Sequence, residues 1–215
     1  MIQLSKTLLL TAIFAFSFLV TMGQGSDKTE LRFRAGVVLG VNATQVDGDD
    51  LAGYHKLGLN GGFIAHIPVS KKFFFSTEIL YTQKGSKSRT YAGYPLAYKL
   101  KLNYAEIPVL INFQEKTALN FGIGISYGRV VKVREFIEGL ENIPTTFDVS
   151  TTDVNELNRS DYNVIANANY LFTKNFFLNV RFAYSFVPVG RFLSSNFNNR
   201  ALYNNLLSFR LGYVF

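Results

Sequence analysis

The sequence contains no cysteine among its 215 residues. This absence excludes a disulfide framework, a thiolate zinc site and the lipid-modified N-terminal cysteine of a lipoprotein. Histidine is scarce too, since only His55 and His66 occur. Hydrolases of the Ser-His-Asp type hold a histidine beside a nucleophile in a fixed geometry, and neither histidine lies in such a motif. We therefore predict a non-enzymatic protein with no catalytic residue, no cofactor and no metal site.

Long apolar runs are also missing, apart from one near the N-terminus at residues 8–20. This run follows a single lysine, is too short to span a bilayer comfortably, and is followed by small residues up to Gly23. These features predict a cleaved signal peptide over residues 1–23 and one exported domain over residues 24–215. The alternative is an uncleaved membrane anchor, but no stop-transfer flank follows Gly23.

Acidic residues are fewer than basic ones, and the formal net charge is +7 at pH 7. A basic chain can bind nucleic acid, because Lys and Arg displace the counterions of its phosphates. The export signal argues against that partner, since a protein outside the cytoplasm meets lipid phosphates instead. We expect no nucleic acid partner.

The mature chain shows the two-residue alternation of β-strands, and no segment carries a helical stripe over three turns. We predict strands at residues 31–42, 56–68, 73–86, 98–111, 117–130, 161–171, 175–189 and 204–215. Average strands have about five or six residues, whereas a tilted strand that crosses a membrane needs about nine to eleven. The length of the predicted strands therefore favours membrane crossing.

The predicted connections alternate strictly in length. Short ones fall at residues 69–72, 112–116 and 172–174, and long ones at 43–55, 87–97, 131–160 and 190–203. Short periplasmic turns and long outer loops are typical of bacterial outer-membrane barrels with an even strand count. The sequence predicts an all-β protein, an eight-stranded antiparallel transmembrane β-barrel located in the cell outer membrane.

The two faces of each predicted strand suit lipid on one side and a barrel interior on the other. In the fifth strand Phe121, Ile123 and Ile125 share a face, opposite Gly122 and Gly124. Aromatic residues crowd the strand ends, as interfacial girdles do: Phe73, Tyr81, Tyr127, Tyr162, Tyr170, Phe176, Tyr184 and Tyr213. Because hydrocarbon tolerates no unpaired strand edge, the first and last strands must meet, and side chains fill the lumen of eight strands.

The last predicted strand carries a possible assembly signal. Phe209, Leu211, Tyr213 and Phe215 share one face, and the sequence ends on the aromatic Phe215. A terminal strand of this kind resembles the signal that outer-membrane proteins present to the barrel-assembly machinery, which we expect as a partner during biogenesis. The alternative is an ordinary closing strand without a signalling role.

Two neighbouring strands carry a family resemblance. The stretch LNYAEIPVLI at residues 102–111 resembles the Tyr-Leu-Glu-Ile-Pro-Leu-Leu strand of the PorT-like outer-membrane β-barrel family, with Ala105 in place of a bulkier residue. EILYTQKG at residues 78–85 and the opening from Ala35 to Asn42 fit the same family. The resemblance implies the fold and the outer membrane. Since a few members are linked to protein secretion, it implies that process as one candidate role.

Charged residues on the inner face predict an ion-pair network. Glu78 and Glu106 lie on adjacent predicted strands, and three arginines share the inward parity. An isolated buried ion is costly, so charges inside a narrow barrel must be paired. We predict a lumenal network of Arg34, Glu78, Glu106, Arg181 and Arg210. The alternative, acid-base chemistry by the two carboxylates, lacks an accompanying nucleophile or cleft. His66 is expected to face the lumen as a polar plug.

The outer side offers two further candidate contacts. The 131–160 loop is acidic, which suits either a solvated contact for a protein partner or, at Asp153, Asn155 and Glu156, oxygen ligands to calcium. Basic residues cluster where the strands leave the membrane, and lipopolysaccharide phosphates are their expected partners. The alternative is that they are ordinary polar residues of the rim. They are Lys56, Lys84, Lys87, Arg89, Lys99, Lys101 and Arg129.

Three functions fit these observations. The first is a non-enzymatic outer-membrane barrel that acts as a structural or protein-interaction module, for example as an accessory of secretion or envelope assembly. The second is a small-solute channel. The third is an outer-membrane lipid-modifying enzyme, which requires a polar catalytic cluster at one rim that the sequence lacks.

Overall fold

The computed structural model describes residues 32–49, 53–88, 97–116, 118–138, 157–192 and 200–215. The predicted signal peptide, residues 1–23, lies outside the described residues. Phe33–Phe215 forms one compact unit. Within the described residues, no helix is long and apolar enough to cross a membrane.

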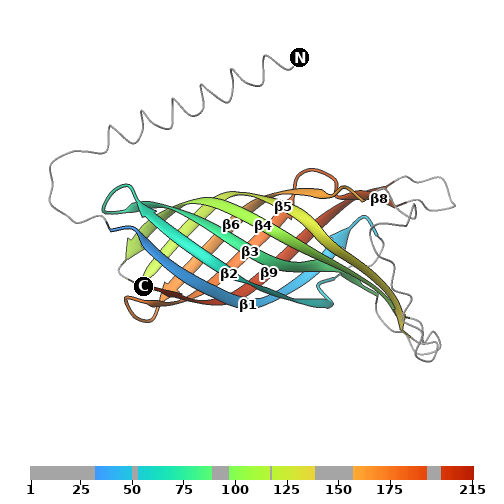
Figure 1. Ribbon diagram of the computed structural model, residues 1–215, viewed down its shortest axis with the longest axis horizontal. Coiled ribbons are helices and arrows are strands. Elements are labelled where there is room, and N and C mark those ends of the chain that lie inside the picture. The colour runs from blue at the N-terminus through green and yellow to red at the C-terminus, as the bar shows by residue number, and fades with distance from the viewer. Residues whose placement is uncertain (1–31, 50–52, 89–96, 117, 139–156, 193–199) are drawn as a thin grey trace, which may run out of the picture. The chain divides into compact units, whose positions relative to one another are not determined.

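The compact unit is a closed barrel of antiparallel strands (Figure 1). Its strands are β1 (Arg34–Asp47), β2 (Lys56–Pro68), β3 (Phe73–Lys87), β4 (Ala97–Lys116), β5 (Leu119–Glu138), β6 (Ser160–Leu171), β7 (Phe176–Ser185), β8 (Gly190–Phe192) and β9 (Arg200–Val214). Each long strand pairs with the next, and β1 also pairs with β9, which closes the barrel. The predicted eight-stranded antiparallel barrel is therefore confirmed, with β8 as a short addition that pairs only with β9.

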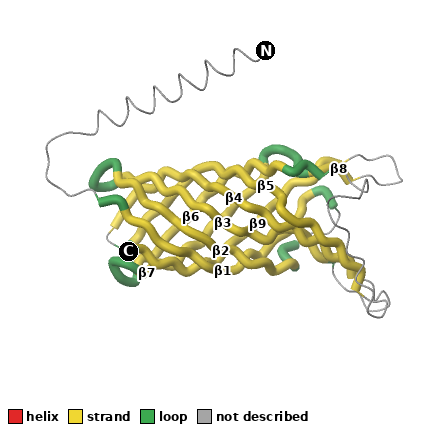
Figure 2. Tube along the Cα trace, viewed as in Figure 1, coloured by secondary structure: helices red, strands yellow, loops and turns green. Residues whose placement is uncertain are grey.

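Several strands are longer than predicted at their outer ends. β1 continues to Asp47 instead of residue 42, and β5 continues to Glu138 through part of the predicted 131–160 loop. β4 and β5 stay paired out to Ala97 and Glu138, so their hairpin extends beyond the other strands (Figures 1 and 2). The pairing shifts register at Val131, which has no partner on β4. Such a bulge bends and twists a hairpin locally.

The region between β7 and β9 also differs from the prediction. β7 ends at Ser185, not at residue 189. Pro188 follows soon after, and a proline cannot donate the backbone hydrogen bond that a central strand needs. β8 then pairs with the outer end of β9, which begins at Arg200 instead of residue 204.

The short connections are tight turns at the end of the barrel that carries the C-terminus. In the β2–β3 turn the Ser70 hydroxyl accepts a hydrogen bond from the Phe73 amide at 3.1 Å. In the β6–β7 turn the Thr173 hydroxyl accepts one from the Phe176 amide at 3.0 Å. Short polar side chains of this kind stabilise turns by binding nearby backbone groups. By the usual plan of these barrels, this end is the periplasmic end and the opposite end is the outer end.

Lipid-facing and lumen-facing positions alternate as predicted. In β5 the side chains of Phe121, Ile123 and Ile125 are exposed at 48%, 66% and 59%, whereas Ser126 is buried. Aromatic rings contact one another at both ends of this apolar belt. Phe176 and Tyr213 lie 4.7 Å apart between centroids at the periplasmic end, and Tyr127 and Tyr162 lie 5.3 Å apart at the outer end. Two such rings of aromatic residues are typical of the membrane interfaces of a β-barrel.

Candidate functional site

The barrel interior is the part of the molecule with the densest polar chemistry. Besides Lys56, six charged side chains are turned into it by strand parity and are at most 4% exposed. They are Glu78 and Lys84 of β3, Glu106 of β4, Asp161 of β6, Arg181 of β7 and Arg210 of β9. Hydrogen bonds divide these residues into two clusters.

The first is the Glu78 cluster, formed by Glu78, Arg181, Arg210 and Asn179. Arg181 donates Nη2 to Glu78 Oε1 at 2.6 Å and Nη1 to Oε2 at 3.1 Å. Arg210 donates Nη1 to Glu78 Oε2 at 2.8 Å and Nε to Asn179 Oδ1 at 2.7 Å. One carboxylate therefore binds two guanidinium groups from different strands, in the geometry that favours strong charge-assisted hydrogen bonds.

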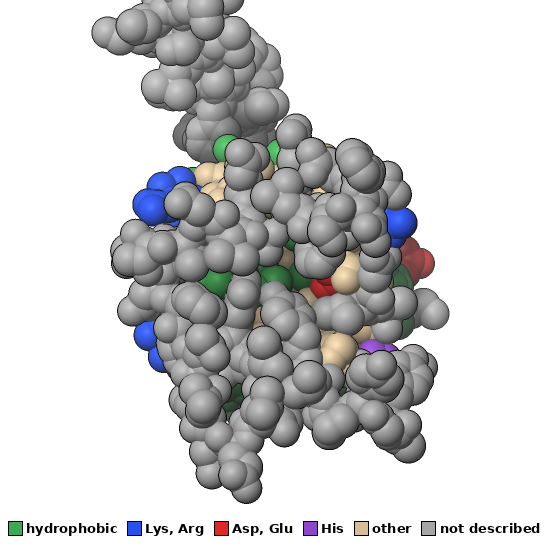
Figure 3. Space-filling model, turned by 90° about the vertical axis from the view of Figure 1, so that its right-hand side faces the viewer, with side chains coloured by type: hydrophobic (Ala, Val, Ile, Leu, Met, Phe, Trp, Pro, Cys, Tyr) green, Lys and Arg blue, Asp and Glu red, His purple; other side chains and the backbone are tan. Residues whose placement is uncertain are grey.

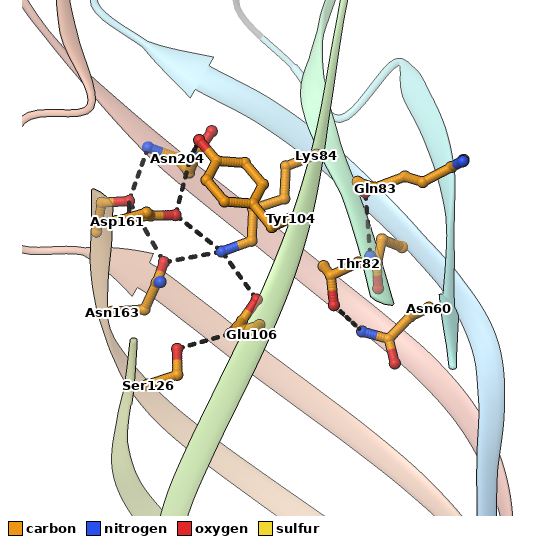
Figure 4. A network of polar contacts seen from close by, with 12 residues as sticks. Asn60, Thr82, Gln83, Lys84, Tyr104, Glu106, Ser126, Asp161, Asn163 and Asn204 are labelled. Atoms are coloured by element: carbon orange, nitrogen blue, oxygen red, sulfur yellow. Dashed lines mark hydrogen bonds and ion pairs between the residues drawn. The ribbon is translucent and has the colours of Figure 1, made fainter. Parts of the chain in front are cut away.

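The second is the Lys84 cluster, formed by Lys84, Glu106, Asp161 and their hydrogen-bond partners (Figure 4). Lys84 Nζ lies 2.9 Å from Asp161 Oδ2 and 3.2 Å from Glu106 Oε2. The partners hold the two carboxylates in place. Ser126 donates to Glu106 at 2.6 Å, Ser185 donates to Asp161 at 2.6 Å, and Asn204 donates to Asp161 at 2.9 Å. The ammonium also lies 5.0 Å from the centre of the Tyr104 ring, a cation–π distance.

The two clusters balance each other in charge. The Glu78 cluster has two cations and one anion, and the Lys84 cluster has one cation and two anions. The charge of Glu106 acts on Arg210, so the clusters lie within electrostatic reach of each other. The charges of the two clusters together sum to zero, which avoids the high cost of an uncompensated ion within them.

Apolar layers lie beyond the charged clusters at both ends of the lumen. The outer layer contains Val46, Leu100, Leu102, Tyr104, Val133, Val189 and Leu202. The periplasmic layer contains Ile64, Phe177 and Val214, with Leu171 packed against them. The interior of an eight-stranded barrel is just wide enough for side chains to fill. The described part of the lumen is thus filled by alternating polar and apolar side chains.

The predicted network is only partly the one observed. The structure brings Glu78, Arg181 and Arg210 together. Glu106 lies in the other cluster and pairs with Lys84, not with an arginine. Arg34 belongs to neither cluster, because it lies at the periplasmic end, where its Nη2 donates to the Lys174 carbonyl at 2.5 Å. At the end of a strand a guanidinium reaches turn carbonyls more easily than the lumen centre.

Two basic residues that the sequence predicts at the outer rim are instead buried. Lys84 is 0% exposed and Lys56 is 2% exposed, so neither is a rim residue. Lys84 shares inward parity with Glu78 and Thr82, and Asp161 shares it with Asn163. Strand alternation alone was therefore a sufficient signal for Lys84 and for Asp161, which sequence reasoning missed. Of the other rim residues, Arg129 is exposed and Arg89 lies outside the described residues.

The two lumenal glutamates have different partners. Glu78 is held by two guanidinium groups, Glu106 by the Lys84 ammonium and the Ser126 hydroxyl, and they lie in different clusters. Among the described residues, no group of three His, Asp or Glu side chains is arranged to hold a metal ion. The calcium alternative at Asp153, Asn155 and Glu156 lies outside the described residues.

His66 is placed near the periplasmic end of β2. Its ring lies 5.0 Å from that of Phe74 and 6.3 Å from that of Phe177, which belongs to the periplasmic apolar layer. The residue is half-buried and packs against these aromatic rings.

A closed antiparallel barrel with a lipid-facing apolar belt, two aromatic girdles and a filled lumen defines an outer-membrane β-barrel protein. The chain belongs to the family described as outer membrane protein beta-barrel domain, whose model matches residues 22–190. Family and fold together give the outer membrane as its location.

Several solved outer-membrane proteins are similar in fold. Ail of Yersinia pestis, solved with the heparin analogue sucrose octasulfate, has 11% identity and a TM-score of 0.47 over 86% of this chain and 99% of that chain. Neisserial surface protein A has 12% identity and a TM-score of 0.49 over 85% of this chain and 96% of that chain. OprG from Pseudomonas aeruginosa has 10% identity and a TM-score of 0.37 over 85% and 94%. A comparison with curated proteins gives no match.

Proposed function

We propose that this protein is a closed, non-enzymatic outer-membrane barrel that acts as an interaction module through its outer end. The supporting observation is the filled lumen, in which two ion-pair clusters lie between two apolar layers. A barrel that encloses only side chains contributes its surface, not a pore. We place the protein among accessories of protein secretion or envelope assembly.

The extended β4–β5 hairpin is the proposed contact element. It is paired out to Ala97 and Glu138, beyond the level of the outer aromatic girdle at Tyr127. A paired hairpin presents a partner with a preorganised surface, which lowers the entropy lost on binding. Loops and hairpins at the end of a rigid barrel are common positions for recognition.

A register-preserving deletion tests this role. Tyr98 pairs with Ile137 and Lys99 pairs with Phe136, so removing residues 98–99 together with 136–137 shortens the hairpin without changing strand parity. We expect the shortened barrel to fold and insert normally but to lose the proteins that copurify with the intact chain from cross-linked native envelopes. Equal recovery of those proteins by both forms would contradict the proposal.

The channel is the second candidate, and conductance separates it from the first. In planar bilayers the closed barrel should give no stable current steps, because opening would require the loss of buried ion pairs. Reproducible unitary steps from the purified wild-type protein would instead favour the small-solute channel. The lipid-modifying enzyme is the least supported, since Glu78 and Glu106 are occupied by cations in the described interior.

The remaining assignments belong to the same proposal. We propose that residues 1–23 are a signal peptide removed on export, and that the chain is a PorT-like member of its family. We propose outer-membrane lipids and lipopolysaccharide as surface contacts, and the barrel-assembly machinery as the partner that reads Phe209, Leu211, Tyr213 and Phe215. Edman sequencing of the mature protein would test cleavage after Gly23.

A further inference from the structure

The buried charges of the described barrel leave one cation without a counter-charge. The buried cations are Lys56, Lys84, Arg181 and Arg210, and the buried anions are Glu78, Glu106 and Asp161. The two clusters use all of these residues except Lys56. The excess positive charge of the interior is therefore localised at one position, the outer end of β2.

The surroundings of Lys56 reinforce the imbalance. Its side chain is 2% exposed, and its Nζ has no hydrogen-bond partner in the structure. The charges that act on it come from Lys101 and Lys99, which have its own sign. Lys84, equally buried, has two carboxylates within 3.2 Å. A buried ammonium without a partner is costly, so the position calls for an anion.

The residue next to Gly85, which Lys56 packs against, carries a second unpartnered group. The Ser86 hydroxyl is buried and also has no hydrogen-bond partner in the structure. Gly85, the neighbour of Ser86, has a φ of 128°, and a Cβ placed on it would lie 3.2 Å from Lys56 Cε. Thr44 of β1 contacts both strands, since its hydroxyl donates to Gly85 O at 2.8 Å and lies 3.3 Å from Lys56 O. An ammonium and a hydroxyl, both unused, thus lie beside the same glycine.

Near Lys56, the outer ends of β2 and β3 are not joined by backbone pairing. β2 and β3 pair from Pro68 and Phe74 only as far as Asn60 and Thr82. Beyond that pair, between residues 56–59 and 83–87, which are all described, no β2–β3 pairing is present. Side chains bridge the seam instead, as where the Leu59 amide donates to Gln83 Oε1 at 3.2 Å. In the described residues, no backbone ladder therefore joins β2 to β3 at the seam.

The lipid side of this seam is apolar and its flank is basic. Leu57 and Leu59 are 74% and 57% exposed on the outer wall. Next to the seam, Lys101 of β4 pairs directly across from Arg134 of β5. Like charges in opposite register destabilise a strand pair unless an anion offsets them. Basic side chains also lie at the perimeter of the outer end (Figure 3).

We propose that the seam between residues 56–59 and 83–87 binds the phosphate group of an outer-membrane lipid, with the Lys56 ammonium and the Ser86 hydroxyl as ligands. The acyl chains would lie on Leu57 and Leu59. A phosphate monoester has up to two negative charges and three acceptor oxygens, which suits the ammonium, the hydroxyl and the neighbouring lysines better than a single carboxylate. The site makes specific the lipid contact proposed above, and the protein-interaction role does not depend on it.

The test compares two lysines of the same β2–β3 hairpin in the full mature barrel. Lys56→Met removes the buried ammonium and keeps an unbranched side chain that is one atom shorter. Lys71→Met makes the same change at an exposed position in the periplasmic turn. Binding of lipid A, of its dephosphorylated form and of inorganic phosphate is measured by native mass spectrometry from neutral detergent.

We expect lipid A to bind saturably to the wild type and to Lys71→Met, and at least tenfold more weakly to Lys56→Met. Dephosphorylated lipid A should bind all three forms as weakly as lipid A binds Lys56→Met. Equal binding of lipid A to wild type and Lys56→Met would overturn the site. Inorganic phosphate that binds as tightly as lipid A, and with the same dependence on Lys56, would overturn the assignment to a lipid.

Stability in neutral detergent provides a second readout. Because Lys56 has no counter-charge in the free protein, Lys56→Met should unfold at the same or a higher urea concentration than the wild type. Lys84→Met should unfold at a lower urea concentration, since it leaves two buried carboxylates without a counter-ion. A loss of stability in Lys56→Met similar to that in Lys84→Met would mean that Lys56 is internally paired, which contradicts the proposal.

Discussion

Glu78 is the only carboxylate of its cluster, so the loss of its charge leaves the cluster without an anion. It is the common acceptor of Arg181 and Arg210, and it comes from β3 whereas they come from β7 and β9. The three residues connect opposite walls of the barrel through its centre. Such a cross-link stabilises the barrel only while both signs are present, because the desolvation of each ion is offset by the other.

We predict that Glu78→Gln is strongly destabilising although the side chain keeps its size. The neutral amide leaves two buried guanidinium groups without a carboxylate, and breaking a buried pair in this way costs about 3 to 5 kcal/mol. The sequence has no tryptophan, so unfolding in urea is followed by circular dichroism and by heat-modified gel mobility. Glu115→Gln, an exposed change of the same chemistry, should leave the midpoint unchanged. A wild-type midpoint for Glu78→Gln would show that the cluster is not a stabilising element.

Glu106→Gln should be milder than Glu78→Gln. Lys84 keeps Asp161 at 2.9 Å when Glu106 loses its charge, so the ammonium remains paired. Removing both carboxylates in Glu106→Gln with Asp161→Asn should then cost more than the sum of the single changes, because the last counter-ion is lost. A double-mutant cycle in urea measures this coupling. Strict additivity would mean that the two carboxylates act independently of Lys84.

At the scale of elements, most of the barrel follows from alternation. The bounds of β2 match the predicted range of 56–68, and β3 and β6 differ from prediction by a single residue at one end. Hydrophobic side chains alternate wherever lipid lies outside, so the signal is strong across the membrane. This alternation signal is weaker beyond the outer aromatic girdle, where β4 and β5 continue as strands outside the lipid. That is why the hairpin beyond residue 130 was expected as a loop.

The sequence predicts that the interior contains ion pairs, but it does not predict which residues pair with each other. Parity gives the inward face of each strand, yet which cation meets which anion depends on the stagger of strands across the lumen. Arg34 has inward parity, but it lies at the periplasmic end of the barrel axis and not at the level of the clusters. It therefore binds a turn carbonyl. Lys84 has the right parity and was misjudged because it lies near the predicted end of its strand. Height along the barrel axis is a property of the closed sheet, and no local pattern encodes it.

The seam between β2 and β3 should be visible in hydrogen exchange. Backbone amides in a strand ladder are protected to the extent that the ladder must open for exchange. We predict that, among the amides that point from one of these strands toward the other, those in residues 56–59 and 83–87 exchange faster than those in residues 60–68 and 74–82, which pair in register. Amides of residues 56–59 that point toward β1, and of residues 83–87 that point toward β4, should stay protected because those strands remain paired. The comparison lies within one hairpin, so detergent and solvent conditions are identical for both parts. Uniform protection along β2 would show that the seam is closed by pairing in solution.

At the scale of the whole molecule, pairing of β1 with β9 closes the wall around the charged interior, and β2 and β3 separate only at their outer ends. Closure removes the exposed strand edges that hydrocarbon does not tolerate, and the charge-balanced clusters remove the need for water inside. The C-terminus takes part in this closure directly, since the Phe215 amide donates to the Ala35 carbonyl at 2.8 Å. The same residue exposes its ring toward lipid at 68%. Its backbone and its side chain therefore have separable roles.

Phe215→Ala is predicted to separate assembly from stability. The substitution keeps the amide that closes β9 onto β1, and it removes a ring that contacts Tyr213 at 5.5 Å on the lipid side. Refolding of the purified variant into detergent should therefore match the wild type in yield and in urea midpoint. If the terminal aromatic is the signal that the assembly machinery reads, the amount of heat-modifiable protein in cell envelopes should fall several-fold, with unfolded chain accumulating in the periplasm.

Ile79→Ala, an equally exposed apolar truncation on β3 at 66%, controls for loss of lipid contact. Normal envelope levels of Phe215→Ala would leave β9 as a closing strand only, whereas poor refolding in detergent would mean that the ring acts through stability and not through recognition.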